Sequence, residues 1–306
     1  MTKIFIDGSA GTTGLRIRER LSDRPGLDIL TLPEDLRKDT EARRVALNSA
    51  DIAFLCLPDA AAREAVTLVD NPNTAIIDTS TAHRTAPGWT YGFPELIGAD
   101  TIAASKRIAN PGCHASGFVA LVAPLVRAGL LAAGARLTCF SLTGYSGGGK
   151  PMIAAYEAAD RDPLLGAPRQ YGLTQSHKHL PEMAVLCGLK YDPVFCPIVG
   201  DFYSGMEVTV PLFGCDLNGT MEDIKTAYRA TYTGHLVTYC DGADESGFLS
   251  AAALAGRDSM QISVGGNPDR ILLTARFDNL GKGASGAAIQ NMNILLGVDE
   301  TTGLVL

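Results

Sequence analysis

The first third of the chain alternates short apolar runs with segments whose apolar positions recur at helical spacing. This pattern predicts short strands over residues 3–7, 27–32, 51–57, 75–78 and 101–104. Helices are predicted over residues 15–21 and 59–69. The runs at 51–57 and 75–78 are almost unbroken, which is typical of parallel strands that are buried on both faces. Strands that alternate with helices in this way predict an open α/β sheet.

The pattern changes after residue 113, where an apolar helical run at 118–126 is followed by longer strands. These strands are predicted over residues 137–143, 194–199, 206–212, 260–264 and 270–277. Helices are predicted over residues 221–232 and 287–296. Long strands that return in antiparallel order indicate a sheet platform rather than a second parallel fold. We therefore expect a second, α+β domain with a mostly antiparallel sheet.

The first predicted strand ends in a glycine-rich turn that leads into a helix. Strand, glycine turn and helix is the context of a dinucleotide-binding fingerprint, although the spacing here is GxxGxxG. Such a turn lets the backbone approach a pyrophosphate at the helix N-terminus. We predict a Rossmann-type dinucleotide-binding domain, with a plain tight turn as the alternative. The expected cofactor contacts are Gly8, Ser9, Gly11, Thr12, Thr13 and Gly14, with Leu57, Pro58 and Ser80 after the later strands.

The end of the second strand bears on the choice of nucleotide. NAD-binding chains usually carry an acidic residue there, which holds the ribose 2′-hydroxyl. This chain has Thr31 and Leu32 at that place, and Arg37 and Lys38 follow. A hydroxyl with two cations nearby suits a 2′-phosphate, which favours NADP(H); a solvated surface charge cluster is the alternative.

Cys113 directly follows a strong turn signal, Asn110-Pro111-Gly112. Because a helical run comes next, we predict that Cys113 lies in the first turn of a helix. Unpaired backbone N–H groups there favour an anion, and a thiol in such a place is biased toward the nucleophilic thiolate. The alternative is that Cys113 is one more small buried hydrophobe.

His177 and His179 are two of only five histidines, and they precede a predicted helix start at Pro181-Glu182. A cysteine nucleophile needs a proton acceptor or an imidazolium neighbour. We predict that one of the pair serves Cys113, with a slight preference for His179, while buried structural histidines are the alternative. The residue types also suit a metal, but nothing supplies a convincing third ligand, so no metal site is predicted.

Two further polar segments are candidates for anion binding. Arg84 follows the strand at 75–78, at the sheet edge where open α/β sheets bind ligands. It is a candidate anion clamp or a surface charge. Gly147-Gly148-Gly149-Lys150 is either a mobile linker or a loop shaped around a phosphate.

Bulk properties narrow the class of protein. The chain has 306 residues, a net charge of −7 and seven cysteines without CxxC spacing. The negative charge disfavours nucleic acid, and the scattered odd cysteines favour a reducing compartment. No apolar run reaches ~18 residues and no signal-peptide pattern opens the chain, so we expect a cytoplasmic protein without membrane contact.

A dinucleotide fold, a nucleophilic cysteine and a histidine together predict one reaction class. Cysteine forms a thioester or thiohemiacetal with the substrate, hydride passes to or from the nicotinamide, and phosphate leaves or enters. The predicted reaction is therefore the interconversion of an aldehyde and an acyl phosphate.

Six motifs spread over the chain resemble those of the N-acetyl-γ-glutamyl-phosphate reductases of arginine biosynthesis, in their shorter, type 2 form. They are GSAGTTG, YGFPEL, NPGCHASGF, TGYSGGGK, SHKHLPEM and DNLGKGASGAAIQNMN. The resemblance implies a fold like that of glyceraldehyde-3-phosphate and aspartate-semialdehyde dehydrogenases. It implies NADPH as cofactor, N-acetyl-γ-glutamyl phosphate as substrate, Cys113 as nucleophile and a histidine of the pair as acid/base.

The resemblance also implies the domain limits and further contacts. Residues 1–112, completed by 280–306, would bind NADP, and residues 113–279 would form the catalytic and dimerisation domain of a homodimer or homotetramer. Additional cofactor contacts are expected at Asn279, Gly281 and Gly283. Substrate contacts are expected at Arg84, Asn110, Ser146, Gly147, Lys150 and Glu182.

Two alternatives remain at this point. Aspartate-semialdehyde dehydrogenase shares the architecture and the cysteine chemistry, but the HKHLPE motif speaks against it. A non-catalytic NADP-binding redox sensor would use Cys113 as a reversible thiol switch. In such a sensor the paired histidines and the glycine–lysine loop would have no role.

Overall fold

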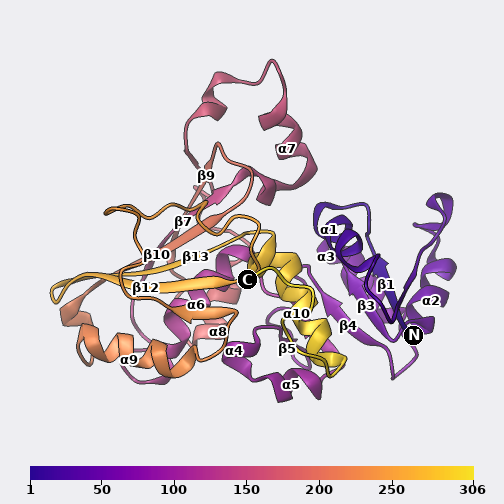
Figure 1. Ribbon diagram of the computed structural model, residues 1–306, viewed down its shortest axis with the longest axis horizontal. Helices are drawn as coiled ribbons and strands as arrows, with labels where there is room; N and C mark the ends of the chain where they lie inside the picture. Colours follow the sequence, from indigo (N-terminus) through magenta and orange to yellow (C-terminus); the bar gives the residue numbers. More distant parts are fainter. The chain divides into compact units, whose positions relative to one another are not determined.

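The computed structural model describes all residues from 1 to 306, and the chain divides into two compact units (Figure 1). Unit 1 contains residues 1–112 and 284–304. Unit 2 contains residues 113–283 and the last two residues, 305–306. None of the helices combines the length and the apolar character that crossing a bilayer requires.

Unit 1 is built on a six-stranded sheet in the order β2-β1-β3-β4-β6-β5, and every neighbouring pair is parallel. The strands are β1 (Thr2–Asp7), β2 (Leu27–Leu30), β3 (Ile52–Leu55), β4 (Ala75–Asp78), β5 (Thr90–Tyr91) and β6 (Arg107–Ala109). The strand order reverses between β1 and β3. Open α/β sheets bind ligands beyond the carboxyl ends of the strands at such a point.

Six helices belong to unit 1: α1 (Thr12–Leu21), α2 (Thr40–Ser49), α3 (Asp59–Thr67), α4 (Pro94–Ile97), α5 (Ala99–Ala103) and α10 (Gly286–Leu295). The strand predicted over residues 101–104 is wrong, because this stretch lies in α5 and at its end. Gly98, at φ +93°, turns the chain into that short helix, and the strand forms later, as β6. Helix α2 was not predicted either, although Asp39 marks its start by accepting a hydrogen bond from the Ala42 amide at 2.7 Å.

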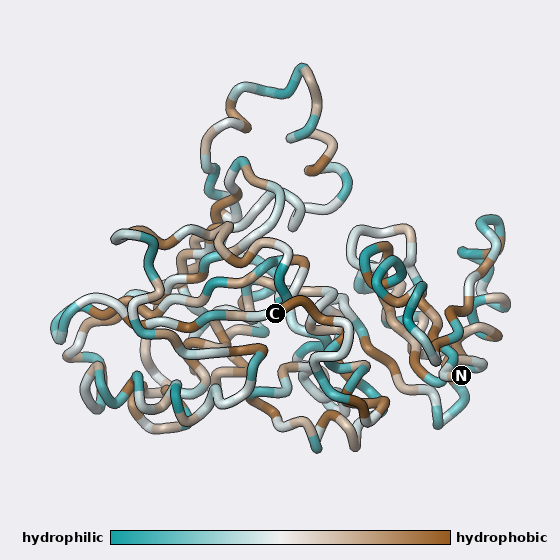
Figure 2. The backbone as a smooth tube through the Cα atoms, in the orientation of Figure 1, coloured by the Kyte–Doolittle hydropathy of each residue, from teal (hydrophilic) through white to brown (hydrophobic).

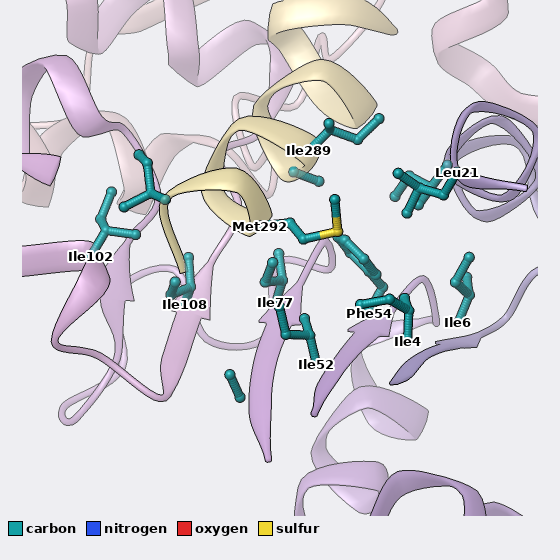
Figure 3. Packing of buried hydrophobic residues seen from close by; sticks show 14 residues of the cluster. Ile4, Ile6, Leu21, Ile52, Phe54, Ile77, Ile102, Ile108, Ile289 and Met292 are labelled. Atoms are coloured by element: carbon teal, nitrogen blue, oxygen red, sulfur yellow. The ribbon is translucent and has the colours of Figure 1, made fainter. Parts of the chain in front are cut away.

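The core of unit 1 joins the two ends of the chain. Ile289 and Met292 of α10 pack into one cluster with strand residues such as Ile77 and Phe54 (Figure 3). All four side chains are at most 1% exposed. The C-terminal helix is therefore a structural part of the parallel-sheet unit, because its apolar face covers strands from the first third of the sequence.

Unit 2 is built on a seven-stranded sheet in the order β11-β12-β13-β10-β7-β9-β8. Its strands are β7 (Thr138–Gly144), β8 (Arg169–Gln170), β9 (Val194–Gly200), β10 (Met206–Phe213), β11 (Val237–Tyr239), β12 (Met260–Asn267) and β13 (Arg270–Phe277). The pairs β7–β9 and β11–β12 are parallel, and the other four pairs are antiparallel. The predicted mostly antiparallel platform is confirmed.

The helices of unit 2 are α6 (Cys113–Arg127), α7 (Gly149–Glu157), α8 (Leu180–Cys187) and α9 (Met221–Thr231). Helix α6 lies tightly on the sheet, since a Cβ at Gly117 would come 2.5 Å from the Val208 side chain of β10. Helix α9 begins with a capping box between Thr220 and Asp223. Hydrophilic residues of α9 are visible in Figure 2 as teal segments along the helix.

The sheet face opposite α6 carries exposed apolar side chains. Paired residues of neighbouring strands share a face, and Thr209 of β10 faces away from Val208 because side chains alternate along a strand. Phe140 pairs with Thr209, and Leu272 pairs with Pro211. Both Phe140 and Leu272 are 45% exposed, so apolar side chains on this face are accessible to solvent.

Candidate active site

Cys113 is the first residue of α6 and is half-buried, which confirms the predicted place of the thiol at a helix start. The rest of α6 anchors this start, because every residue from His114 to Leu125 is buried. On its other side the thiol meets a turn after β13. A Cβ at Gly283 would lie 3.1 Å from the Cys113 Cβ, so the glycine lets this turn approach the cysteine closely.

Three histidines cluster next to Cys113. The ring of His114, the next residue along α6, lies 5.8 Å from that of His177 and 5.5 Å from that of His179. The rings of His177 and His179 are 4.9 Å apart, and the His179 amide donates to His177 Nδ1 at 3.3 Å. The fold therefore brings the predicted histidine pair beside the residue that follows the predicted nucleophile.

Burial keeps two of these histidines neutral. Desolvation, with smaller effects of the charges of His177 and Lys178, lowers the pKa of His114 to about 3. Desolvation also lowers the pKa of His177, with a smaller effect of the Lys178 ammonium. Near neutral pH, both imidazoles can therefore act as hydrogen-bond donor and acceptor rather than as fixed cations.

Two polar partners of this cluster were not predicted from the sequence. His114 Nδ1 lies 2.7 Å from Ser141 Oγ, and His114 Nε2 lies 2.7 Å from the Tyr171 hydroxyl. Burial raises the pKa of Tyr171, and the negative charge of the Cys113 thiolate raises it further. Strand alternation could have identified Ser141, which shares a buried face of β7 with Cys139 and Thr143. Tyr171 lies in a segment without periodicity and gave no signal.

A buried turn after β13 holds several predicted contact residues. Asp278 accepts hydrogen bonds from Ser204 Oγ at 2.8 Å and from the amide of Gly281 at 3.0 Å. Asn279 accepts from the Gly205 amide at 2.9 Å and donates to Ser146 Oγ at 3.0 Å. Asn279 and Ser146 thus bond to each other. Their predicted contacts with cofactor and substrate remain predictions.

The remaining predicted substrate residues of unit 2 occupy three different environments. Gly147 lies near Asn279, whose Nδ2 would be 3.4 Å from a Cβ added there. Lys150 is exposed in the first turn of α7, and Glu182 on α8 is only 2% exposed. The glycine-rich segment forms a 3₁₀ turn and the start of α7, which excludes an extended linker at this place.

The glycine turn of unit 1 has no room for side chains. Gly8 has φ +86°, and a Cβ there would lie 2.2 Å from the carbonyl oxygen of Cys56. A Cβ at Gly14 would lie 2.5 Å from the Gly8 oxygen, and the Gly11 amide donates to that oxygen at 3.0 Å. Thr12 and Thr13 then begin α1, and Pro58 precedes α3. This bare backbone at a helix N-terminus suits the close approach of a pyrophosphate.

A cavity of about 920 Å³ adjoins this turn. Gly8, Ser9, Leu57, Arg37 and Lys38 line it, as do two cations that the sequence analysis missed, Arg18 and Arg43. Arg43 donates from Nε and Nη2 to Asp7 Oδ2 at 3.1 and 3.0 Å. Burial raises the pKa of Asp7, and this hydrogen-bonded guanidinium opposes the effect. The size of the cavity, the glycine turn and the cations fit a dinucleotide.

Arg84 and Asn110 fix the turn that precedes Cys113. The Arg84 guanidinium donates from Nε to the Asn110 carbonyl and from Nη2 to the Thr79 carbonyl, both at 3.0 Å. Asn110 Nδ2 donates to the Ala284 carbonyl at 3.0 Å. Ser80 similarly bonds to Asp78, from Oγ to Oδ2 at 2.8 Å. These contacts give each residue a positioning function, and ligand contacts at the same residues remain predictions.

Comparisons with protein families and with related proteins agree with a dinucleotide-binding unit followed by a second domain. Residues 29–104 match the model described as semialdehyde dehydrogenase, NAD binding domain, and residues 113–279 match its dimerisation domain. An N-acetyl-γ-glutamyl-phosphate reductase of Rhizobium etli is 48% identical over 96% of this chain and 98% of its own length. The chain belongs to the N-acetyl-γ-glutamyl-phosphate reductase family. A Nostoc member of the family, named reductase 2, is 44% identical over 99% of both chains.

The reductase family shares its fold with a second group of enzymes. The crystal structure of aspartate semialdehyde dehydrogenase II from Vibrio cholerae superposes with a TM-score of 0.71 over 97% of this chain and 98% of that one. At 15% identity this likeness shows the fold alone. The predicted fold class and family are confirmed, and the chain is an oxidoreductase with a nicotinamide-nucleotide-binding domain. The aspartate-semialdehyde alternative rests only on distant structural similarity.

Proposed function

We propose that the chain reduces N-acetyl-γ-glutamyl phosphate to N-acetylglutamate 5-semialdehyde and phosphate with NADPH, a step of arginine biosynthesis. The observation that carries the proposal is the place of Cys113. It is a half-buried thiol at the first residue of α6, and its chain neighbour His114 contacts His177 and His179. Family membership supplies the substrate, and the cysteine–histidine cluster supplies the chemistry for an acyl phosphate.

In the first step, the Cys113 thiolate attacks the acyl carbon and forms a C–S bond. The C–O bond to phosphate breaks, the leaving phosphate takes its electron pair, and a thioester remains on Cys113. The start of α6 supports the thiolate, because unpaired amides at a helix N-terminus favour negative charge.

In the second step, the thioester becomes a thiohemiacetal, which collapses to the aldehyde. NADPH supplies the hydride for this reduction. A histidine of the pair donates a proton to the developing alkoxide and takes it back when the C–S bond breaks and the thiolate returns. We assign this role to His179, which is 5% exposed at the N-terminus of α8, and an orienting role to the half-buried His177.

The cavity of unit 1 would hold the dinucleotide. The amides of the turn that begins at Gly8 would bind the pyrophosphate, and Arg37 and Lys38 would bind the 2′-phosphate of NADPH. Both cations line the cavity beyond β2, where an acidic residue would hold a ribose hydroxyl in an NAD-specific protein. Arg18 and Arg43 line the same cavity, together with four carboxylates, of which Asp7 is paired with Arg43.

We also propose that the chain forms a homodimer through the sheet face opposite α6. The dimerisation-domain match over residues 113–279 and the exposed Phe140 and Leu272 on that face support this assembly. Light scattering after gel filtration should give a dimer mass, and Leu272→Glu should reduce it to the monomer mass. Leu164→Glu, at a side chain that is 70% exposed outside this sheet face, serves as the control and should leave the dimer intact. A wild-type monomer would contradict the proposal.

The cysteines support a reducing compartment such as the cytoplasm as the working place of the enzyme. None of the seven is in a disulfide, although five of them are partly or fully exposed.

The activity can be tested in the reverse direction. Purified protein with N-acetylglutamate semialdehyde, NADP⁺ and phosphate should produce NADPH, and omission of phosphate should stop the reaction. Aspartate semialdehyde at the same concentration should give little or no product. Preference for aspartate semialdehyde would identify the other dehydrogenase, and no turnover with either aldehyde would favour a redox sensor.

A further inference from the structure

His114, the residue after Cys113, joins two hydroxyl groups. It is 4% exposed, with Ser141 Oγ at 2.7 Å from Nδ1 and the Tyr171 hydroxyl at 2.7 Å from Nε2. Because the imidazole is neutral, only one of its two nitrogens carries a proton. The position of that proton decides the direction of both hydrogen bonds.

The surroundings of Ser141 determine which nitrogen is protonated. Ser141 is 0% exposed, and His114 Nδ1 is the hydrogen-bond partner of its hydroxyl. If Nδ1 carried the proton, it would donate to Ser141 and the buried hydroxyl proton would have no acceptor. A buried donor without an acceptor is costly. The favoured arrangement therefore has Ser141 donating to Nδ1, while Nε2–H donates to the Tyr171 oxygen.

This arrangement leaves the Tyr171 hydroxyl proton available for another acceptor. Tyr171 is partly exposed. With His114 protonated at Nε2, the Tyr171 oxygen accepts the 2.7 Å hydrogen bond and does not donate its own proton to His114. The Tyr171 hydroxyl lies 2.7 Å from the ring of His114, the residue after Cys113, and burial together with a negative charge on Cys113 raises the pKa of this phenol. A phenol that stays protonated beside an anion is a natural hydrogen-bond donor to it.

We propose that Ser141 and His114 act as a relay that directs the Tyr171 hydroxyl proton toward the Cys113 sulfur, where it stabilises the thiolate. The relay rests on the proposed role of Cys113 as nucleophile. In this proposal Tyr171 is the group that would donate to the reacting sulfur, whereas Ser141 and His114 are positioning residues that act through Tyr171. The relay makes the residue after the nucleophile part of the catalytic apparatus rather than of the core alone.

Several other ionisable groups lie on the elements around Cys113, and their charges also affect the pKa of its thiol. His177, Lys178 and His179 lie on the segment before α8, and Lys178 acts electrostatically on His114 and His177. Buried Glu182 lies on α8, which packs on α6, and buried Lys282 lies on the turn beside Cys113. The test therefore compares variants that change only uncharged hydroxyl groups.

The tautomer of His114 can be observed directly. Two-bond ¹H–¹⁵N spectra of the full chain labelled at histidine should show His114 as a neutral imidazole protonated at Nε2 near pH 7. His114→Gln identifies the signal by its loss. In Ser141→Ala the signal should change to the Nδ1-protonated pattern or to a mixture, since Nε2 can then accept from Tyr171. A wild-type His114 protonated at Nδ1 would overturn the relay.

The effect on the sulfur can be measured without substrate or cofactor. The rate of iodoacetamide alkylation of the Cys113 peptide, followed by mass spectrometry against pH, reports the thiolate fraction. Tyr171→Phe should move the midpoint upward by about one pH unit, a roughly tenfold loss of thiolate below the midpoint. Ser141→Ala should move it in the same direction by a smaller amount. Tyr156→Phe removes a phenol that accepts from Arg169 in the same unit and should leave the midpoint unchanged.

A double variant separates a relay from two independent effects. Ser141→Ala with Tyr171→Phe should give the same midpoint as Tyr171→Phe alone, because Ser141 acts only through the phenol. Additive shifts, or an unchanged midpoint in Tyr171→Phe, would contradict the proposal. Both measurements are made on the free protein, so an unexpected substrate specificity would leave their interpretation intact.

Discussion

A Cβ placed on Gly8 would lie 2.2 Å from the carbonyl oxygen of Cys56, closer than any van der Waals contact allows. The oxygen belongs to the backbone just beyond β3, so it cannot move aside as a side chain would. Gly8 also has φ +86°, a conformation that L-residues with a side chain rarely adopt. The turn after β1 is thus held against the end of β3, where the strand order of the sheet reverses.

Gly8→Ala should therefore destabilise unit 1 and weaken NADPH binding by at least tenfold. Gly26→Ala is a matched control, because Gly26 has φ +84° but no atom within 4 Å of an added Cβ. The control measures only the cost of placing an alanine at positive φ, which is about 1 kcal/mol. Thermal unfolding and cofactor titration of both variants would measure the difference. Equal losses in the two variants would show that contact with Cys56 is unimportant.

Cys113→Ser should lose more than 99% of turnover and bind NADPH nearly as well as the wild type. A hydroxyl ionises far less readily than a thiol at neutral pH, so the nucleophile disappears while the cavity of unit 1 is unchanged. Stopped assays with concentrated enzyme, together with fluorescence titration of NADPH, would test both parts. Activity above a few per cent would remove Cys113 from the mechanism.

Replacing Arg37 and Lys38 together with Ala should weaken NADPH binding much more than NADH binding. The two cations line the cavity of unit 1, and only NADPH carries the 2′-phosphate that they would neutralise. Comparison of kcat/KM for the two cofactors gives the preference of each protein. A wild type that uses both cofactors equally well would contradict the proposed 2′-phosphate site.

His179→Asn should lower kcat by roughly 10²–10⁴-fold and remove a limb of its pH profile, as expected for a proton donor. His177→Asn should mainly raise KM and keep that limb, as expected for an orienting residue. Steady-state kinetics across the pH range would separate the two roles. The reverse pattern would exchange the roles, and near-normal kcat in both variants would place the proton transfer elsewhere.

Stability should decrease in acid because of His114. Its pKa in the folded protein is about 3, below the ordinary value of 6.5, so the unfolded chain binds a proton that the folded chain excludes. The contribution of His114 is therefore fully present above about pH 6.5 and is lost as the pH falls toward 3. His114→Gln should show a shallower decrease of the unfolding midpoint between pH 7 and 4. Exposed His235→Gln should retain the wild-type slope.

Periodicity predicted most of the framework because the core of each unit is built from regular elements. Val208 and its alternate neighbours identified β10, and the Asn-Pro-Gly turn placed Cys113 at the start of α6. Short elements were less predictable. Residues 99–103 contain too few turns for helical spacing to be recognised, and a run such as Thr-Ile-Ala-Ala fits a strand equally well.

The missed site residues share a different cause. Tyr171 and Ser141 meet His114 only after β7, β9 and the segment before α8 are packed, and no local pattern carries that information. Arg43 lies on α2, which the analysis did not predict, and its hydrogen bond to Asp7 depends on how that helix packs on β1. Local chemistry therefore pointed to Cys113 as the proposed nucleophile, whereas the polar groups around His114 are determined by tertiary structure.

The composition of the unit 1 core constrains the order of events during synthesis. At about 5–20 residues per second, α10 leaves the ribosome roughly 10–35 s after residue 112. During this interval the apolar surface around Ile77 and Phe54 lacks Ile289 and Met292, its partners in the finished protein. We expect this apolar surface to stay exposed in nascent chains that end before α10, so that chaperones can bind it. Unit 2, whose sheet and helices come from a nearly continuous stretch, can form before the unit that precedes it in sequence.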